Sequence, residues 1–159
     1  MKHLISIFLL ITFFTAGICY SQSFHTKSNK ALKTYNEGVS AYDYYDLSKA
    51  EILFKEAVSI DREFFEAYMM LGELMSKQRR YSEAATYFRY AVKLDSMFFK
   101  PVFFSLGQAE MKSGDYLNAL VHLQVYLGQT GMSEKNTLVA QKSVRNCEFA
   151  LKALKNPVP

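Results

Sequence analysis

The sequence predicts an all-α protein in which helical hairpins repeat along the chain and one further helix follows them. Apolar residues recur at helical spacing across residues 31–155, and short polar breaks separate the runs. The layout of run, break and run repeats with a period of about 34 residues. The last run is apolar along one side only, which is typical of a helix at the end of a stack.

The stretch at residues 64–95 shows the repeating unit most clearly. Its first half, 64–75, is so apolar that a helix there must be covered on more than one face. A basic break at 77–80 follows, and Ser82 is expected to begin the next helix, because a serine hydroxyl can accept from a free backbone N–H. The second half has apolar residues at helical spacing: Ala84, Ala85, Phe88, Ala91, Val92 and Leu94.

A shift of the sequence by 34 residues aligns identical residues of helix-packing type. The aligned pairs are Gly72 with Gly38, Ala84 with Ala50, Phe88 with Phe54, Ala91 with Ala57, and Asp95 with Asp61. A shift of 35 in the other direction aligns Leu71-Gly72 with Leu106-Gly107, Tyr81 with Tyr116, Ala84 with Ala119, and Phe88 with Leu123. The extra residue falls in the 96–101 turn, where an insertion is tolerated.

The remaining elements follow in order. The first unit has helices at about 31–43 and 47–60, joined by a turn at 44–46, and the third has helices at 102–113 and 116–129. Glycines at 128 and 131 can then end a helix. The capping helix is expected at 133–155, with its apolar stripe at Ala140, Val144, Cys147, Leu151 and Leu154.

These residues resemble the tetratricopeptide repeat family. The resemblance rests on Ala67, Tyr68, Leu71, Gly72, Tyr81, Ala84, Phe88 and Ala91, on Gly114-Asp115-Tyr116, and on the first unit. It implies a right-handed α-solenoid of three repeats, at about 31–63, 64–98 and 99–131, with the capping helix last. The proline that usually stands between repeats is replaced by Arg62 and Ser96, and Pro101 follows at a helix start.

The N-terminal residues 1–21 read as a secretory signal peptide, because Lys2 and His3 precede a short apolar run and small residues precede a cut after Ser21. Lipidation at Cys19 and an uncleaved anchor are the alternatives, although the run is short for a bilayer core of about 30 Å. Residues 22–30 are expected to be a flexible lead, and residues 156–159 an extended tail.

The residue pattern argues against catalysis and against a metal or cofactor site. His122 has neither acids nor thiols at ligand spacing and is expected at the surface or groove edge, while Cys147 is expected to be buried, with an intermolecular disulfide as the alternative. Glu66 and Glu73 lie two turns apart on one helix face as groove-lining or solvated carboxylates. The net charge of +4 is spread along the chain, and the basic quartet 77–80 suits a helix C-terminus, so nucleic acid is not expected.

The resemblance implies a concave groove lined by the first helix of each repeat. The residues expected to face it are Tyr35, Val39, Tyr42, Met69, Glu73, Ser76, Phe104, Gln108 and Met111. The cationic and amide clamp that cytosolic family members use for acidic tails is absent, since Tyr35, Val39 and Met69 hold its places. An aromatic, methionine-rich groove suits an apolar or extended peptide.

The expected function is a non-enzymatic, exported adaptor that binds a protein or peptide partner, another envelope protein, in the periplasm or at the outer membrane of a Gram-negative bacterium. Membrane contact is expected only through lipidation at Cys19 or through the partner. The alternative is a structural component of envelope assembly that spaces or self-associates. The layout also resembles the N-terminal region of envelope proteins that carry a β-propeller and an OmpA-like domain, with residues 147–157 as the similar tail.

Overall fold

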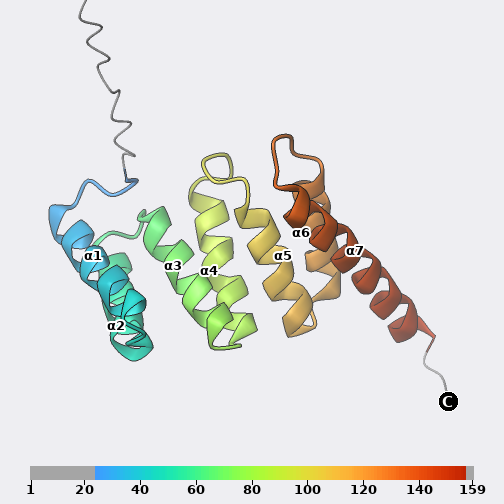
Figure 1. Ribbon diagram of the computed structural model, residues 1–159, viewed down its shortest axis with the longest axis horizontal. Helices are drawn as coiled ribbons and strands as arrows, with labels where there is room; N and C mark the ends of the chain where they lie inside the picture. The colour runs from blue at the N-terminus through green and yellow to red at the C-terminus, as the bar shows by residue number, and fades with distance from the viewer. Residues whose placement is uncertain (1–23, 157–159) are drawn as a thin grey trace, which may run out of the picture.

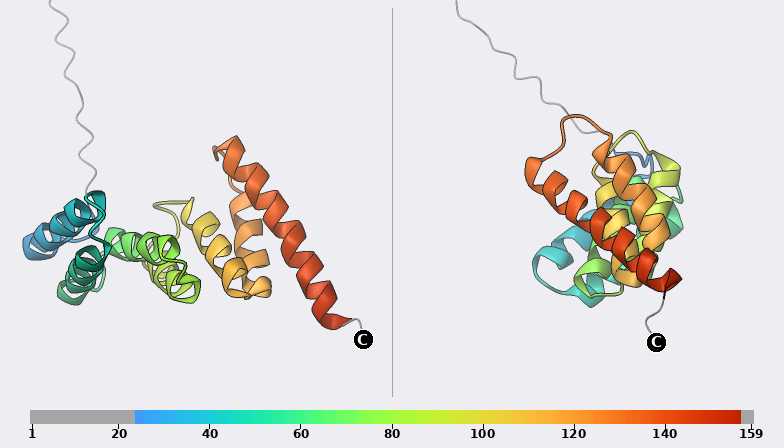
Figure 2. Two further views of the ribbon diagram at one scale, coloured as in Figure 1. Left: turned by 60° about the horizontal axis from the view of Figure 1, so that its bottom comes forward. Right: turned by 90° about the vertical axis from the view of Figure 1, so that its right-hand side faces the viewer.

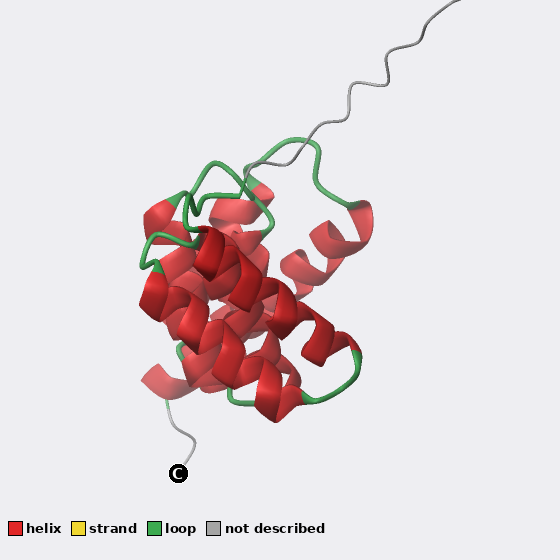
Figure 3. Ribbon diagram, turned by 90° about the vertical axis from the view of Figure 1, so that its left-hand side faces the viewer, coloured by secondary structure: helices red, strands yellow, loops and turns green. Residues whose placement is uncertain are grey.

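The computed structural model describes residues 24–156, so the expected signal peptide, Cys19 and the end of the tail lie outside it. Over this range the chain forms seven α-helices and no strand, which confirms the predicted all-α class (Figure 3). The helices are α1 (Asn29–Asp43), α2 (Leu47–Ile60), α3 (Phe65–Lys77), α4 (Tyr81–Leu94), α5 (Val102–Ser113), α6 (Tyr116–Leu127) and α7 (Glu134–Lys155).

The first six helices pair as three antiparallel hairpins that stand side by side, and α7 packs against α6 and α5 at the end of the row (Figure 1). Turns within a hairpin lie at one edge of the molecule and connections between hairpins at the other (Figure 1). Helix α7, with 22 residues, extends beyond the helices it covers (Figure 2). The predicted solenoid of three hairpins and a capping helix is therefore present.

A glycine on the first helix of each hairpin allows close contact with the second helix. A Cβ atom added at Gly72 would lie 2.5 Å from Cε1 of Phe88, and one at Gly38 would lie 2.8 Å from Cε1 of Phe54. Gly107 has the same relationship with Leu123, at 2.6 Å from its Cγ. The residues that align at the repeat spacing are thus the ones that set the distance between paired helices.

The predicted element bounds hold within two residues, with two corrections. Helix α4 begins at Tyr81 with Arg80 as its N-cap, so Ser82 is not the start residue and lies inside the first turn. The Arg80 guanidinium bonds both carboxylate oxygens of Glu83, and Arg79 adopts a positive φ of 61°, which ends α3 and positions the next helix. Helix α6 ends at Leu127 rather than at Gln129.

The lead is also corrected, because part of it packs on the domain and does not behave as a free segment. Thr26 is buried, and its hydroxyl donates to the Asp61 carboxylate at the end of α2. The Thr26 oxygen accepts from the backbone N–H of Ser28, and Ser28 in turn caps α1 by accepting from Ala31. The lead is therefore continuous with the N-cap of the first helix.

Candidate functional site

The first helices of the hairpins, α1, α3 and α5, together form one face of the solenoid, which we call the first-helix face. Two neighbouring hollows lie on it, and Glu73 of α3 lines both. The first, the aromatic hollow, lies between α1, α3, the lead and the turn before α5. The second, the polar hollow, lies between α3, α4 and α5.

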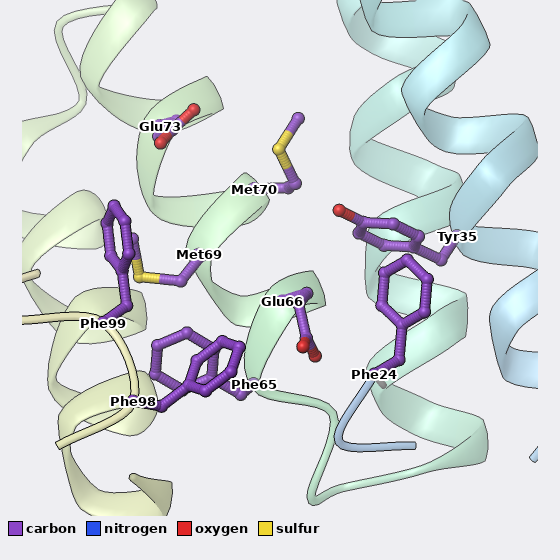
Figure 4. A pocket seen from close by; sticks show the side chains of 9 residues that line it. All are labelled: Phe24, Tyr35, Phe65, Glu66, Met69, Met70, Glu73, Phe98 and Phe99. Carbon is purple, nitrogen blue, oxygen red and sulfur yellow. The ribbon is translucent and has the colours of Figure 1, made fainter. Parts of the chain in front are cut away.

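The aromatic hollow has a volume of about 190 Å³ and is enclosed by rings and thioethers (Figure 4). Phe24 and Tyr35 stand on one side of it (Figure 4). On the other side, Phe65 comes from the start of α3, and Phe98 and Phe99 come from the turn before α5 (Figure 4). Its lining residues are Phe24, Tyr35, Phe65, Glu66, Met69, Met70, Glu73, Phe98 and Phe99.

A histidine of the lead joins the two segments that wall the aromatic hollow. His25 Nδ1 lies 3.0 Å from Glu66 Oε1, and its Nε2 lies 3.5 Å from Asp95 Oδ2. The other Asp95 oxygen, Oδ1, accepts from the backbone N–H groups of Met97 and Phe98, so this carboxylate shapes the turn before α5. The His25 ring also packs against both Phe65 and Phe98. The position of the turn thus depends on the lead.

The electrostatic environment of the aromatic hollow is acidic. Its lining has two carboxylates, Glu66 and Glu73, and no lysine or arginine. Glu73 remains accessible to solvent on the first-helix face, but the surrounding walls partly desolvate its carboxyl and raise its pKa. Burial raises the pKa of Tyr35 to about 12, and the negative charges of Glu66 and Glu73 add to this shift. Both carboxylates therefore act on the same hollow.

The polar hollow is larger, at about 380 Å³, and its lining contains more polar side chains. Gln108 of α5 extends to α7, where its Nε2 donates to Ser143 Oγ at 2.7 Å, so the capping helix fixes one side chain of this face. Lys112 lies with its Nζ 5.1 Å from the ring centre of Tyr81. The lining residues are Glu73, Ser76, Tyr81, Phe88, Phe104, Ser105, Gln108, Ala109 and Lys112.

The structure brings six of the nine expected groove residues to the two hollows. They are Tyr35 and Met69 in the aromatic hollow, Glu73 in both, and Ser76, Phe104 and Gln108 in the polar hollow. The other three, Val39, Tyr42 and Met111, are half-buried and pack against the core clusters. Met69 is only 7% exposed, so it contributes as much to the core as to the hollow.

Sequence reasoning missed four of the aromatic walls, one of which is Phe65 at the start of α3. Phe24 lies in the segment expected to be flexible, and Phe98 and Phe99 lie in the turn that carries the extra residue. The one available signal was composition, because aromatic residues are unusual in short polar leads and turns. Their partners, however, are distant in sequence and are not encoded in the helical period.

A second polar cluster lies outside both hollows and corrects the expectation for His122. Glu110 of α5 is fully buried, and its two oxygens lie 2.9 Å from Arg89 Nη2 and 2.7 Å from His122 Nδ1. His122 is therefore beside an acid, which its neighbours in sequence did not indicate. The cluster links α4, α5 and α6, and its position between packed helices indicates a structural role.

The remaining candidates from the sequence lie away from the hollows. Cys147 is buried and free, as expected. In the basic quartet, Lys77 packs over the rings of Tyr42 and Tyr45, and Arg80 pairs with Glu51 and Glu83.

Within residues 24–156, no group of three or more acids, histidines or cysteines is arranged to hold a metal. No helix in the same range is long and apolar enough to cross a membrane.

Comparison with known proteins identifies the repeat and the fold. Residues 65–96 match the family model described as tetratricopeptide repeat. No curated protein sequence matches the chain. Among solved structures, the Sgt2 TPR domain from Aspergillus fumigatus is similar with a TM-score of 0.64 and 18% identity, over 83% of this chain and 86% of that chain.

Two similar structures contain bound peptides. The first TPR of Spaghetti, bound to the HSP90 peptide SRMEEVD, has a TM-score of 0.67 and 16% identity, over 80% of this chain and 98% of that one. The Yersinia enterocolitica type III secretion chaperone SycD, in complex with a peptide of the translocator YopD, has a TM-score of 0.66 and 13% identity, over 77% and 95%. At these identities the likeness establishes the shared fold.

Proposed function

We propose that this chain, a tetratricopeptide repeat protein by its matched repeat and its fold, is a non-enzymatic module that binds a partner peptide or helix on its first-helix face. The observation that carries the proposal is the pair of adjacent hollows that share Glu73. Together they offer a continuous track from α1 to α5, with one apolar part and one polar part. Such a surface suits an extended segment that alternates apolar anchors with polar contacts.

Proteins of the same fold support the choice of a peptide as ligand. Spaghetti and SycD each hold a peptide in the structures to which this chain is similar. The chemistry of the ligand differs in this proposal, because SRMEEVD carries four acidic groups at its end, counting the C-terminal carboxylate, whereas Glu66 and Glu73 face the aromatic hollow here. An acidic tail would meet like charges there, which disfavours it.

We further propose that the protein is an exported adaptor of the periplasm or outer membrane, with another envelope protein as partner. The support is the composition of residues 1–21, which suits a signal peptide. The intact mass of the protein from envelope fractions tests this part. A chain that starts at Gln22 supports a soluble exported adaptor, a lipidated chain that starts at Cys19 supports a tethered one, and a chain that retains residues 1–21 contradicts export by cleavage.

Two matched serine variants test the binding face. Ser76→Arg fills the polar hollow with a long side chain, whereas Ser82→Arg places the same side chain on the exposed surface of α4. We expect the first variant to lose capture of the native partner and the second to keep it, with equal helical circular dichroism. Capture that survives Ser76→Arg would exclude the first-helix face as the binding surface.

A second candidate, a spacer that self-associates, has one observation in its favour. Leu117, Val121 and Val125 form an exposed apolar row along α6. Sedimentation of the full chain against Leu117→Lys and Val121→Lys variants tests it. A concentration-dependent dimer that both variants dissolve would favour this candidate over the adaptor.

A further inference from the structure

We propose that the aromatic hollow receives a cationic side chain, arginine or lysine, of the partner peptide. This inference rests on the proposed function and specifies the chemistry of the residue that the partner inserts. It assigns recognition to walls that come from the lead and from the turn before α5, and not only from the helices of the repeat.

The size of the hollow suits one long side chain. Its volume of about 190 Å³ is below the range of roughly 300–1,000 Å³ in which pockets hold a whole small molecule. It is open on the first-helix face, so a peptide lying across α3 can insert a side chain while its backbone stays on the surface.

The walls of the hollow favour a cation that also has apolar surface. Phe24 packs edge-on against Tyr35, with ring centres 5.7 Å apart, and Phe65 packs edge-on against Phe98 at 5.3 Å. Rings in such pairs fix each other, so the hollow is already formed without a ligand. Aromatic faces attract a guanidinium or ammonium group, and the methylene stem of the side chain can pack on the rings and on Met69 and Met70.

The carboxylates of the hollow favour a ligand with a positive charge. Glu66 already has His25 as a partner, whereas Glu73 has no ion-pair or hydrogen-bond partner within residues 24–156. Partial desolvation raises the pKa of Glu73, which indicates that its negative charge lacks compensation. A lysine of this face, Lys112, lines the neighbouring polar hollow and packs on Tyr81. A cation that enters from the partner would compensate Glu73.

Other ligand classes fit less well. A wholly apolar side chain would remove more water from Glu73 without replacing it by a partner, which is costly. An acidic side chain would add a third negative charge to a space that already holds two carboxylates. A cationic side chain flanked by apolar residues satisfies both the rings and the carboxylates.

Methyl NMR of the full chain with ¹³C-labelled methionine tests the inference. Met69 and Met70 line the hollow, whereas Met111 and Met132 lie outside it, pack against the core cluster of α6 and α7, and serve as internal controls. The probes are the tripeptide acetyl-Leu-Arg-Leu-amide and the same peptide with citrulline, which is neutral and has nearly the same shape. We expect the arginine peptide to shift only the Met69 and Met70 signals and to bind about tenfold more tightly than the citrulline peptide.

The variant Glu73→Gln tests whether the Glu73 charge causes the preference for arginine. Its matched control is Glu56→Gln, on the exposed side of α2. We expect Glu73→Gln to reduce binding of the arginine peptide to the citrulline level and to leave the citrulline peptide unchanged. Glu56→Gln should change neither. Equal binding of the two peptides, no shift with either, or a preference that survives Glu73→Gln would overturn the inference.

These outcomes are separate from a failure of the proposed function. If Ser76→Arg abolishes partner capture while arginine and citrulline peptides bind equally, the binding face stands and the cation assignment falls. If Ser76→Arg leaves partner capture intact, the proposed function itself fails, whatever the tripeptides do.

Discussion

Asp61 and Asp95 occupy equivalent positions in consecutive repeats, and each contacts one of two adjacent residues of the lead. Asp61 accepts from the hydroxyl of Thr26, and Asp95 faces Nε2 of His25 at 3.5 Å. The repeat spacing thus sets the spacing of two anchor points for the lead. Because His25 also contacts Glu66, the lead, α3 and the turn before α5 form one unit around the aromatic hollow.

This arrangement predicts that docking of the lead depends on pH. Burial alone would lower the His25 pKa, but the hydrogen bonds and charges of Glu66 and Asp95 outweigh it and raise the pKa above 6.5. A group with a raised folded-state pKa stabilises the fold fully below its unfolded-state pKa. This stabilisation is lost as the pH rises through the folded-state pKa. The contribution of His25 should therefore be present below pH 6.5 and decrease above it.

Denaturant unfolding of the wild type and of His25→Gln across this pH range measures the effect. We expect the free energy of unfolding of the wild type to fall more steeply with increasing pH than that of the variant, which cannot be protonated. Parallel curves would show that His25 does not carry a linked charge.

The glycine contacts predict a large cost for a single methyl group. Gly72→Ala should lower the free energy of unfolding by about 1–3 kcal/mol, because the added Cβ overlaps the buried Phe88 ring and forces it to shift. Gly128→Ala is the matched control, since its added Cβ meets only backbone oxygens at 3.6 Å. Urea unfolding compares the two, and equal stabilities would contradict the packing described for the hairpins.

The buried carboxylate of Glu110 predicts a stability loss that its sequence context does not indicate. Glu110→Ala removes the shared partner of Arg89 and His122 and leaves a cavity between α4, α5 and α6. Arg89 and His122 are partly exposed and can turn to water, so we expect a loss of about 1–3 kcal/mol in thermal or urea unfolding. Glu56→Ala, on the exposed side of α2, should change stability little. An equally small change in Glu110→Ala would refute the structural role of the cluster.

We expect Cys147 to react slowly with thiol reagents. Burial raises the pKa of this thiol, and the nearby charge of Glu148 adds to the shift, so little thiolate is available. Native protein should react much more slowly than protein unfolded in urea. A disulfide-linked dimer on non-reducing electrophoresis would instead show that Cys147 becomes accessible.

The fold could be predicted from the sequence because the residues that specify it lie close together in the chain and recur at a fixed spacing. The pairs Gly72–Phe88 and Gly38–Phe54 recur at the repeat spacing, and the helices follow from apolar residues three and four apart. The aromatic hollow could not be predicted in the same way. His25 and Thr26 contact residues 41 and 35 positions away, and these contacts depend on how finished repeats stack. The Glu110 cluster likewise needs three helices in place before its partners meet.

Site-specific photo-crosslinking in the native host locates the face on which the partner binds. A photoreactive residue at position 76, in the polar hollow, is compared with one at position 82 on the outer surface of α4. We expect a crosslink from position 76 to one partner protein, through a segment that contains an arginine or lysine near the aromatic hollow, and no such crosslink from position 82. A partner crosslinked from position 82 and not from position 76 would contradict binding on the first-helix face.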